Sequence, residues 1–456
     1  MPKSILIIGG GISGLSLLHY LKIKYYFQDD VNLLLLEENE CLGGAIHTIR
    51  RNDCIFETGP NGFLDSKPRT LQLIKDLNLE NSLLAADSQS KSRYVSARNR
   101  LHAVPMTPRE FISSGILNPF DKVRFLLEIF AAKGNNPNES VYAFTQRHFG
   151  NKSAQVLVDP LVKGIFAGDA KQLIMKEIFP QIYQWEQEFG SLFKAMETMK
   201  KERQKEGKAA AGPGSLKSFQ GGMSELIDAL GKKYESNIRI NEHVLSIQFE
   251  DNQFVVNSHG GQYKADQIFL STPAHAAARL LEPLDKPLAQ ELNRIFYAPI
   301  AVIGLVFQTQ NLKKIPAGFG YLIPSTEQNP VLGVLFENKI FHNRCRENQI
   351  FFRVMIGGAH FPEILKNPKD ELMNMAIREI HKHFPVSEKP QETFYTSWPR
   401  AIPQYDIDYV QAKAQIVKLL GQYPHLHLVA NYLNGVSVND CIENAYQAVQ
   451  NFSLAS

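Results

Sequence analysis

The sequence predicts an α/β protein built from a discontinuous dinucleotide-binding unit, a second β-sheet and a helical segment. Three observations support this prediction. The chain opens with a strand, a glycine turn, a helix and a second strand. Strand-like runs return after a long helical stretch, and the chain ends with a strand that leads through a glycine into a helix. Its 456 residues are too many for one hydrophobic core, so two or three domains are expected.

The opening glycine turn has the pattern G-x-G-x-x-G. The apolar run Ile5–Ile8 predicts the first strand, and Gly9, Gly11 and Gly14 follow it. In a Rossmann-like unit these glycines give a tight turn, close approach of the backbone to a pyrophosphate and close packing of helix on strand. The helix from about Ser13 directs its free N–H groups at the pyrophosphate, so no lysine is required there.

An acidic residue follows the second predicted strand. The apolar run Val31–Leu36 ends in Glu37, where a dinucleotide fold places the acid that binds a ribose diol. The neighbouring Glu38 disfavours a 2′-phosphate, which argues against NADP.

Two more glycine turns indicate a cofactor longer than a nicotinamide dinucleotide. Gly43 and Gly44 come soon after the acid, and Gly59–Gly62 follows within the next 20 residues. A nicotinamide fingerprint normally ends at the acid, whereas the flavin half of FAD extends beyond the pyrophosphate. The alternative interpretation is that both are ordinary turns within a sheet.

Composition excludes several classes of protein. A net charge of +3 gives no electrostatic case for a nucleic-acid partner. The four cysteines contain no C-x-x-C pair, so neither a metal site nor a disulfide framework is expected, and a reducing cytoplasm is favoured. The first predicted strand begins near residue 3, so no signal peptide is expected ahead of it. No run approaches the roughly 20 apolar residues of a spanning helix.

The middle of the chain is predicted to alternate between helix and hairpin. Pro68–Leu79 has helical spacing, and residues 92–105 resemble a hairpin in which Arg93 stands beside apolar strand residues. Residues 107–149 are helical in pattern. Within them, Phe111–Phe130 has apolar and basic residues that suit a membrane surface, although packing within the domain is the alternative.

Two later segments are interpreted as irregular. Asp159–Asp169 mixes small residues with bulky apolar ones, as expected of a turn against a flat ligand. Lys200–Lys208 and the following AAAGPG are interpreted as a solvated helix end and a flexible domain boundary.

The remaining pattern predicts strands, two helices and a division into three units. The predicted strands are 238–240, 244–249, 254–257, 267–271, 300–307, 331–336, 350–356 and 425–430, and the predicted helices are 369–384 and 441–452. The predicted units are 1–90, 210–290 and 395–456 for the FAD-binding domain, 91–105 and 291–394 for a substrate-binding domain, and 106–209 for a helical subdomain.

Three stretches identify a family. Together with the glycine motifs, Pro160–Gly168, Ser218–Met223 and Gly435–Ile442 resemble the FAD-dependent amine oxidase superfamily and, within it, the protoporphyrinogen oxidases. The resemblance covers almost the whole chain. It implies oxidation of a porphyrinogen to a porphyrin by FAD in haem biosynthesis, with oxygen as the acceptor. It also allows a homodimer and peripheral contact with the cytoplasmic membrane.

The motifs and the resemblance together assign site residues. Gly164 and Phe166 are assigned to the catalytic site, and Arg93 to the substrate propionates, because a guanidinium binds a carboxylate with two parallel bonds. The expected cofactor contacts are Gly9, Gly10, Gly11, Ile12, Ser13, Gly14, Glu37, Glu38, Gly44, Ala45, Gly59, Pro60, Asn61, Gly62, Val244, Gly435, Val436, Ser437 and Val438. Two of these depart from the eukaryotic pattern, since Ala45 replaces a bulkier residue and Asn61 occupies an arginine position.

Other functions are compatible with the same motifs. A flavin amine oxidase or a carotenoid-type desaturase would share the scaffold, and a non-catalytic FAD-binding protein is a third reading. Between porphyrinogens, the residues leave protoporphyrinogen IX and coproporphyrinogen III both open.

Overall fold

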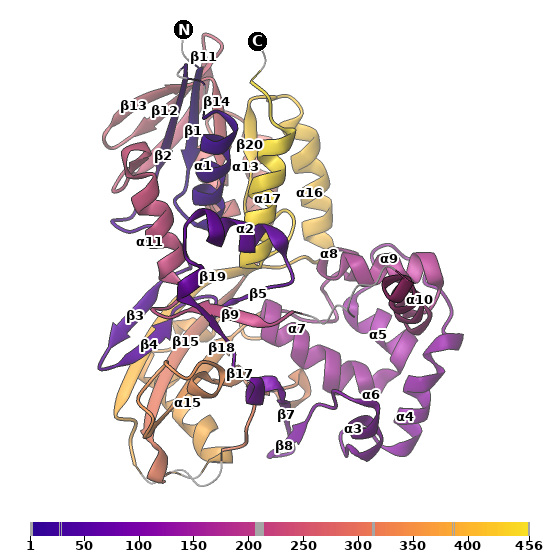
Figure 1. Cartoon of the computed structure of the whole chain (residues 1–456). Helices are drawn as coiled ribbons and strands as arrows, with labels where there is room; N and C mark the ends of the chain where they lie inside the picture. Colours follow the sequence, from indigo (N-terminus) through magenta and orange to yellow (C-terminus); the bar gives the residue numbers. More distant parts are fainter. Residues whose placement is uncertain are drawn as a thin grey trace.

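The chain folds around two large sheets (Figure 1). The computed structural model describes residues 3–26, 28, 30–205, 214–311, 315–384, 386 and 388–454. A parallel sheet lies in the upper part of Figure 1, and a mainly antiparallel sheet lies in the lower part.

The parallel sheet has five strands within the described residues, and they come from distant parts of the chain. In spatial order they are β10 (Ile238–Arg239), β2 (Val31–Leu36), β1 (Lys3–Ile8), β14 (Gln267–Leu270) and β20 (Leu426–Leu428). β1 is central and pairs with β2 on one side and β14 on the other, so the order in which strands are added to the sheet changes direction at β1. Ligands bind at such switch points in open α/β sheets.

Alternating side chains of β1 build two cores. Ile5 and Ile7 pack under α1 (Ile12–Lys24), α11 (Ser224–Lys233) and α17 (Val438–Asn451). Leu6 and Ile8 face the opposite layer. That layer contains α12 (Ala274–Leu281), α13 (Lys286–Asn293), α16 (Ile407–Leu420) and an antiparallel sheet of β11 (Val244–Glu250), β12 (Gln253–Ser258) and β13 (Gly261–Ala265).

The second large sheet has seven strands in the described part of the chain. In spatial order they are β19 (Glu392–Pro403), β15 (Tyr297–Gln308), β18 (Gln349–Gly357), β17 (Val331–Phe336), β16 (Gly320–Leu322), β7 (Arg93–Ala97) and β8 (Arg100–Ala103). Only the β7–β16 pair is parallel among the pairs in this sheet. Helix α15 (Lys369–His383) packs on one face, which leaves the other face toward the parallel sheet and the helical region.

Short elements connect the two sheets. They are β3 (Thr48–Arg51), β4 (Cys54–Glu57), β5 (Phe63–Leu64), β6 (Leu83–Ala85), β9 (Leu216–Phe219), α2 (Pro68–Asp76) and α14 (Glu337–Ile340).

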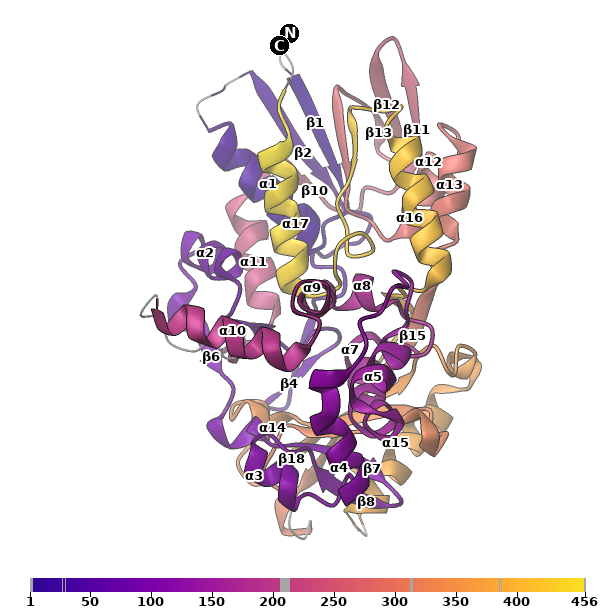
Figure 2. The same cartoon turned by 90° about the vertical axis from the view of Figure 1, so that its right-hand side faces the viewer.

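A group of helices projects to the right in Figure 1 and faces the viewer in Figure 2. It contains α3 (Pro108–Ser113), α4 (Pro119–Leu126), a 3₁₀ turn (Leu127–Phe130), α5 (Val141–Phe149), α6 (Asn151–Ser153), a π turn (Ala154–Val158), α7 (Asp159–Phe166), α8 (Met175–Ile178), α9 (Pro180–Phe189) and α10 (Leu192–Lys205). Among the described helices, none is both long and apolar enough to cross a bilayer.

The predicted turn at Asp159–Asp169 is wrong. Residues Asp159–Phe166 form helix α7, and Pro160 does not interrupt it because proline is tolerated in the first turn. The helix ends at Ala167, which has a left-handed conformation with φ of 50°. The boundary predicted near Lys200–Lys208 lies partly outside the described residues, and α10 continues to Lys205.

Candidate functional site

The site is built from the carboxyl edge of the parallel sheet. The turn Gly9–Gly11 follows β1 there, and α1 and α17 both begin at this edge. A Cβ on Gly14 would lie 1.9 Å from the carbonyl oxygen of Gly9, so only glycine allows α1 to start this close to the strand. The sequence prediction of strand, turn and helix is therefore confirmed at these residues.

The edge leaves room for a diphosphate. A Cβ built on Gly11 meets nothing within 4 Å, and one on Gly44 meets only the Cα of Gly11, at 3.6 Å. The N-terminus of α1 has no side-chain cap and no acidic residue in its first turn. Beside it, the hydroxyls of Ser271 and Thr272 are buried without a partner. Free N–H groups, open space and unpartnered hydroxyls fit a phosphate-bearing cofactor.

Glu37 is fixed beside the same turn. Its Oε2 accepts a hydrogen bond from Gly10 N at 2.6 Å, and its Oε1 accepts two from Asn39. A carboxylate has about four lone-pair sites, so a ribose hydroxyl can still donate to it. Val244 is buried at the start of β11, close in sequence to Glu242, whose N–H donates to the Glu37 carbonyl. Glu38, by contrast, lies at the surface, 3.2 Å from His243 and 3.8 Å from Arg279.

The C-terminal helix brings a second N-terminus to this edge. Ser437 caps α17 by accepting from Asp440 N, while the Asp440 carboxylate accepts from Ser437 N. The preceding Gly435 has φ of +112° and donates to the hydroxyl of Tyr405 at 3.1 Å. Burial raises the pKa of the Cys441 thiol to about 11, against the effect of a hydrogen bond with Ser13 of α1. The first turns of α1 and α17 are therefore adjacent.

The third glycine turn is held between the two sheets. A Cβ on Gly59 would lie 2.0 Å from the carbonyl oxygen of Ala45, and one on Gly62 would lie 2.3 Å from that of Lys217. From the seven-stranded sheet, Trp398 Nε1 donates to the Thr58 carbonyl at 2.8 Å, and Arg353 donates to the Gly59 carbonyl. The expected contacts Pro60 and Asn61 lie within this clamped turn.

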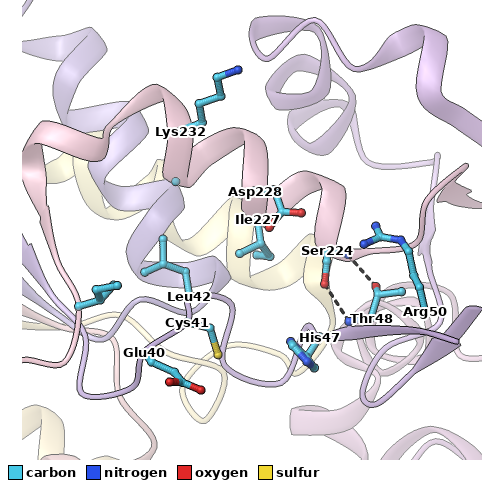
Figure 3. Close-up of a pocket in the computed structure, with 12 residues that line it drawn as sticks. Glu40, Cys41, Leu42, His47, Thr48, Arg50, Ser224, Ile227, Asp228 and Lys232 are labelled. Atoms are coloured by element: carbon cyan, nitrogen blue, oxygen red, sulfur yellow. Dashed lines mark hydrogen bonds between the residues drawn. The ribbon is translucent and has the colours of Figure 1, made fainter.

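A cavity of about 580 Å³ lies behind the Gly43–Gly44 loop (Figure 3). One wall is the loop, including Cys41, Leu42 and His47, and the other is α11. Leu42 separates this cavity from the glycine turn, because its Cδ2 lies 2.6 Å from the position of a Cβ on Gly10. Reciprocal hydrogen bonds between Thr48 and Ser224 join the two walls, so α11 holds the end of the loop.

Arg93 and α7 meet the same face of the seven-stranded sheet. Ser96 and Tyr321 bond to residues of α15, so they point to the opposite face. By strand alternation Arg93 and Leu322 point away from α15. A Cβ on Gly164 of α7 would lie 2.5 Å from Leu322, which shows how closely this helix approaches β16. Arg93 is exposed, lies 5.2 Å from the Phe319 ring centre and donates to Lys91 O at 3.3 Å.

Phe166 lies differently from Gly164. Its ring is buried edge-on against Phe179, with the centroids 6.0 Å apart, within the helical core. Its carbonyl accepts from Gln404 Nε2 at 2.9 Å, and the next carbonyl, of Ala167, accepts from Ala359 N at 2.7 Å. The end of α7 is therefore pinned by residues that follow β18 and β19.

Sequence reasoning missed several polar groups. Ser271 and Thr272 follow a fully buried strand, and this position at a strand end was a usable signal. Arg353 interrupts the apolar run Ile350–Ile356, and a charged residue there indicates a buried partner. Lys163 of α7 is 1% exposed and its Nζ has no hydrogen-bond partner; burial lowers its pKa to about 8.

Comparison with known proteins gives consistent full-length matches. Among curated relatives, coproporphyrinogen III oxidase of Bacillus subtilis is 25% identical over 98% of this chain and 97% of its own. Protoporphyrinogen oxidase of Bos taurus is 29% identical over 98% of both chains. Protoporphyrinogen oxidase 2 of Arabidopsis thaliana is 28% identical over 98% of this chain and 93% of its own.

Solved structures share the fold. A candidate protoporphyrinogen oxidase from Exiguobacterium sp. 255-15 superposes with a TM-score of 0.83 at 21% identity, over 99% of this chain and 98% of its own. Cyclohexylamine oxidase from Brevibacterium oxydans gives a TM-score of 0.67 at 14% identity, over 99% and 98%. The model of the flavin containing amine oxidoreductases matches residues 12–451. This chain therefore belongs to the flavin-containing amine oxidoreductase family, and its cofactor is FAD.

Proposed function

We propose that this protein oxidises a porphyrinogen to a porphyrin with FAD, in haem biosynthesis, and passes the electrons to oxygen. The observation that carries the proposal is the correspondence, over nearly the full length of both chains, with relatives named coproporphyrinogen III oxidase and protoporphyrinogen oxidase. It is supported by a guanidinium, Arg93, on the sheet face that α7 approaches.

This reaction requires no strong general acid or base from the protein. A porphyrinogen bridge carbon lies between two electron-rich pyrroles, so the substrate itself stabilises the cation left by hydride loss. FAD supplies the hydride acceptor when bound. The chain has to orient one bridge carbon and exclude water from it.

Arg93 and Gly164 are the residues that we assign to this task. The Arg93 guanidinium would bind a propionate through paired N–H groups. Gly164 would border the reacting bridge carbon at the point where α7 lies against β16, an approach that its missing side chain allows. Phe166 has a different part in this proposal, since its ring packs in the helical core and positions the end of α7.

Anaerobic reduction of the flavin tests this proposal. The flavin absorbance should bleach when protoporphyrinogen IX or coproporphyrinogen III is added, and the porphyrin should appear in step with it. Matched additions of a primary amine and of a carotenoid precursor test the two alternative functions on the same scaffold. Bleaching by either of these and by neither porphyrinogen would overturn the proposal.

We also propose that the helical region rests on a membrane surface at the cytoplasmic side. Phe120 is 80% exposed and Phe130 is 77% exposed. With five further exposed residues they form an apolar platform on α3, α4 and the 3₁₀ turn that follows α4. The platform consists of Ile112, Phe120, Val123, Leu126, Leu127, Ile129 and Phe130. Several large apolar side chains exposed on neighbouring short elements are typical of an interaction site.

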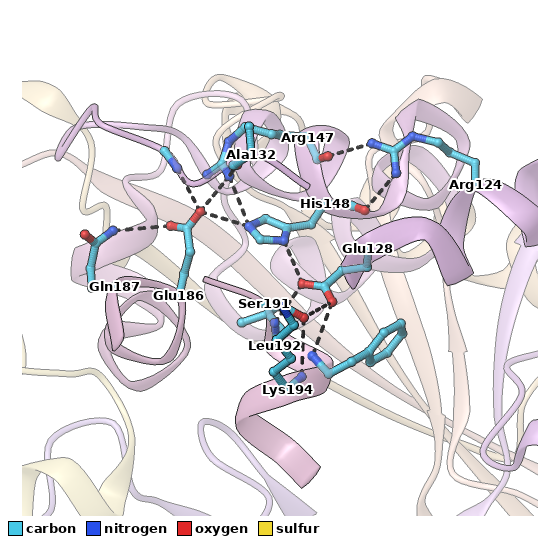
Figure 4. A network of polar contacts seen from close by, with 12 residues as sticks. Arg124, Glu128, Ala132, Arg147, His148, Glu186, Gln187, Ser191, Leu192 and Lys194 are labelled. Atoms are coloured by element: carbon cyan, nitrogen blue, oxygen red, sulfur yellow. Dashed lines mark hydrogen bonds and ion pairs between the residues drawn. The ribbon is translucent and has the colours of Figure 1, made fainter. Parts of the chain in front are cut away.

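A buried ionic network includes Glu128 of the 3₁₀ turn that carries part of this platform (Figure 4). His148 lies between two carboxylates, 2.9 Å from Glu128 Oε1 and 3.0 Å from Glu186 Oε1. Arg147 adds contacts to Glu139 and, at 2.6 Å, to Glu186. Because Glu128 belongs to the turn Leu127–Phe130, the network holds this turn in place.

Sedimentation with anionic and zwitterionic lipid vesicles tests the membrane proposal. Phe120→Ser combined with Phe130→Ser should reduce binding several-fold, because two large apolar side chains no longer enter the interface. Val417→Ser, at an exposed position on α16, is the matched control. Equal binding of all three proteins would contradict the proposal.

The domain division also remains a proposal, with one boundary moved. Strand β19 of the seven-stranded sheet runs from Glu392 to Pro403, so a boundary at residue 395 would cut it. We place the return to the FAD-binding domain after Pro403.

A further inference from the structure

The Gly59–Gly62 turn stands over a cluster of buried charges. Four charged side chains, Glu57, Glu337, Arg344 and Arg353, are each less than 5% exposed and lie in one group with Asn61. Glu57 and Arg344 are 3.5 Å apart, and Arg353 Nη1 lies 3.8 Å from Glu337 Oε1. Buried charges are retained only where they are paired or bind something, so this cluster requires an explanation.

Several polar atoms of the cluster have no hydrogen-bond partner. They are both amide atoms of Asn61, both carboxylate oxygens of Glu337, Nε and Nη1 of Arg344, and Nε of Arg353. Burial raises the pKa of Glu337, and the Arg353 and Arg344 guanidiniums and the Asn61 amide oppose that shift. Asn61 and Arg353 therefore approach the same carboxylate, one from the turn and one from the sheet.

The position of Arg353 explains why it can serve the turn. Phe352 and Val354 pack in the core with α15, so Arg353 points to the opposite face of β18, toward the turn. It donates to the carbonyl of Gly59. Position 61, in the same turn, is asparagine, whose amide faces the same carboxylate.

We propose that Arg353 positions the Gly59–Gly62 turn against the flavin from the sheet, and that it favours the reduced flavin electrostatically. Reduction adds negative charge to the ring system, and a cation shielded from water interacts with that charge more strongly than a solvated one. Arg353 is thus a positioning residue. The inference rests on the assignment of this turn to the cofactor and is independent of which substrate is oxidised.

The test compares three variants by FAD affinity and by the two-electron flavin potential. Arg353→Met should bind FAD about tenfold more weakly. Its equilibrium constant for reduction should fall about tenfold, which for a two-electron couple is about 30 mV more negative. Arg353→Lys keeps the charge and should retain most of the potential. In the double variant Asn61→Arg with Arg353→Met, a guanidinium again faces Glu337, and both properties should return toward the original values.

Arg346→Met is the matched control, because Arg346 is an exposed arginine that pairs with Asp53 at the surface. It should change neither property. If Arg353→Met does not fold, Arg353→Lys and the double variant are compared directly with the unmodified protein. An unchanged potential and FAD affinity in Arg353→Met would overturn the proposal. The proposal would also be overturned if the double variant folds but its flavin potential is as low as that of Arg353→Met, because packing alone would then explain the arginine. Where Arg353→Met does not fold, a potential of the double variant about 30 mV below that of Arg353→Lys would have the same meaning.

Discussion

At the scale of single residues, Gly11 gives the sharpest test of the cofactor site. Its missing side chain faces open space at the edge where the diphosphate is expected. Gly11→Val should abolish the bound flavin, because branched carbons would occupy that space. Absorbance at the flavin bands, measured on protein refolded with excess FAD, checks this. Gly115→Val is the control, since a Cβ there also meets nothing within 4 Å but lies in the helical region. Full flavin occupancy in Gly11→Val would show that the motif does not hold the cofactor.

Arg93 gives the corresponding test of the substrate site. Arg93→Ala should lower kcat/KM for a porphyrinogen about tenfold to a hundredfold, since a charge-assisted hydrogen bond contributes roughly 1.5–3 kcal/mol. The loss should appear mainly in KM if the contact is equally strong in the ground and transition states. It should be smaller with coproporphyrinogen, whose extra propionates have other partners available.

The controls for Arg93→Ala separate substrate binding from other effects. The flavin spectrum should stay intact, because Arg93 lies on β7 and is assigned to substrate alone. Arg100→Ala, at an exposed position on the same hairpin, should change nothing. Unchanged kcat/KM in Arg93→Ala for both porphyrinogens would make Arg93 an ordinary solvated strand residue.

At the scale of elements, the ionic network of the helical region makes acid stability predictable. Burial raises the pKa of Glu186, but hydrogen bonds from Arg147, Gly134 N and His148 outweigh it and hold that pKa below its usual value. The same balance, with Ser191, Leu192 and Phe193 as donors, lowers the pKa of Glu128. A carboxyl with a depressed folded pKa contributes stability above its unfolded pKa, and this contribution is lost as pH falls through the folded pKa.

Glu186→Gln should therefore destabilise the protein most at neutral pH, by about 3–5 kcal/mol if the buried pair is broken outright. Its stability should depend less on pH below about 5 than that of the unmodified protein. Chemical denaturation followed from pH 7 to pH 4 measures both effects. Glu188→Gln, at an exposed position on the same helix, should match the unmodified protein throughout. Parallel pH profiles for the two substitutions would contradict the assigned role of the network.

The elements also show how far local sequence patterns reach. Strands β2 and β17 were predicted with their observed ends, because continuous apolar runs bounded by polar residues define buried strands. The pattern of α7 predicts a turn, because glycine and proline usually interrupt a helix. Only the structure shows that Gly164 is needed for the close contact with Leu322. Strand β19 was missed since it contains two prolines, which an edge strand tolerates and a central strand does not.

At the scale of the whole molecule, local sequence patterns predict the glycine turns of the expected cofactor site, but not the residues that the fold brings beside them. The glycine turns are local signals, so they could be recognised without knowing the fold. The row that joins Arg93, Gly320, Leu335 and Arg353 across four neighbouring strands depends on strand order and register. Three strand spacings place Arg93 and Arg353 about 14 Å apart on one face. No pattern along the chain could have related residues 93 and 353.

The parallel sheet joins the beginning, middle and end of the chain, so cofactor binding should stabilise the molecule as a whole. Expected FAD contacts come from the turn after β1, from the Gly59–Gly62 turn and from the start of α17. At a free FAD concentration of about 100 times Kd, binding adds about 2.7 kcal/mol to the free energy of unfolding. Trp398 donates to the Thr58 carbonyl beside the Gly59–Gly62 turn. The chain has two tryptophans, so Trp398 is the remaining one in the variant Trp185→Phe. Thermal unfolding of this variant, followed by Trp398 fluorescence and by far-UV circular dichroism, should move to higher temperature by the same amount on adding FAD. When Gly11→Val is added to this variant, neither signal should move. A shift in only one of the two signals in the Trp185→Phe protein would show that FAD stabilises a part of the molecule rather than the whole.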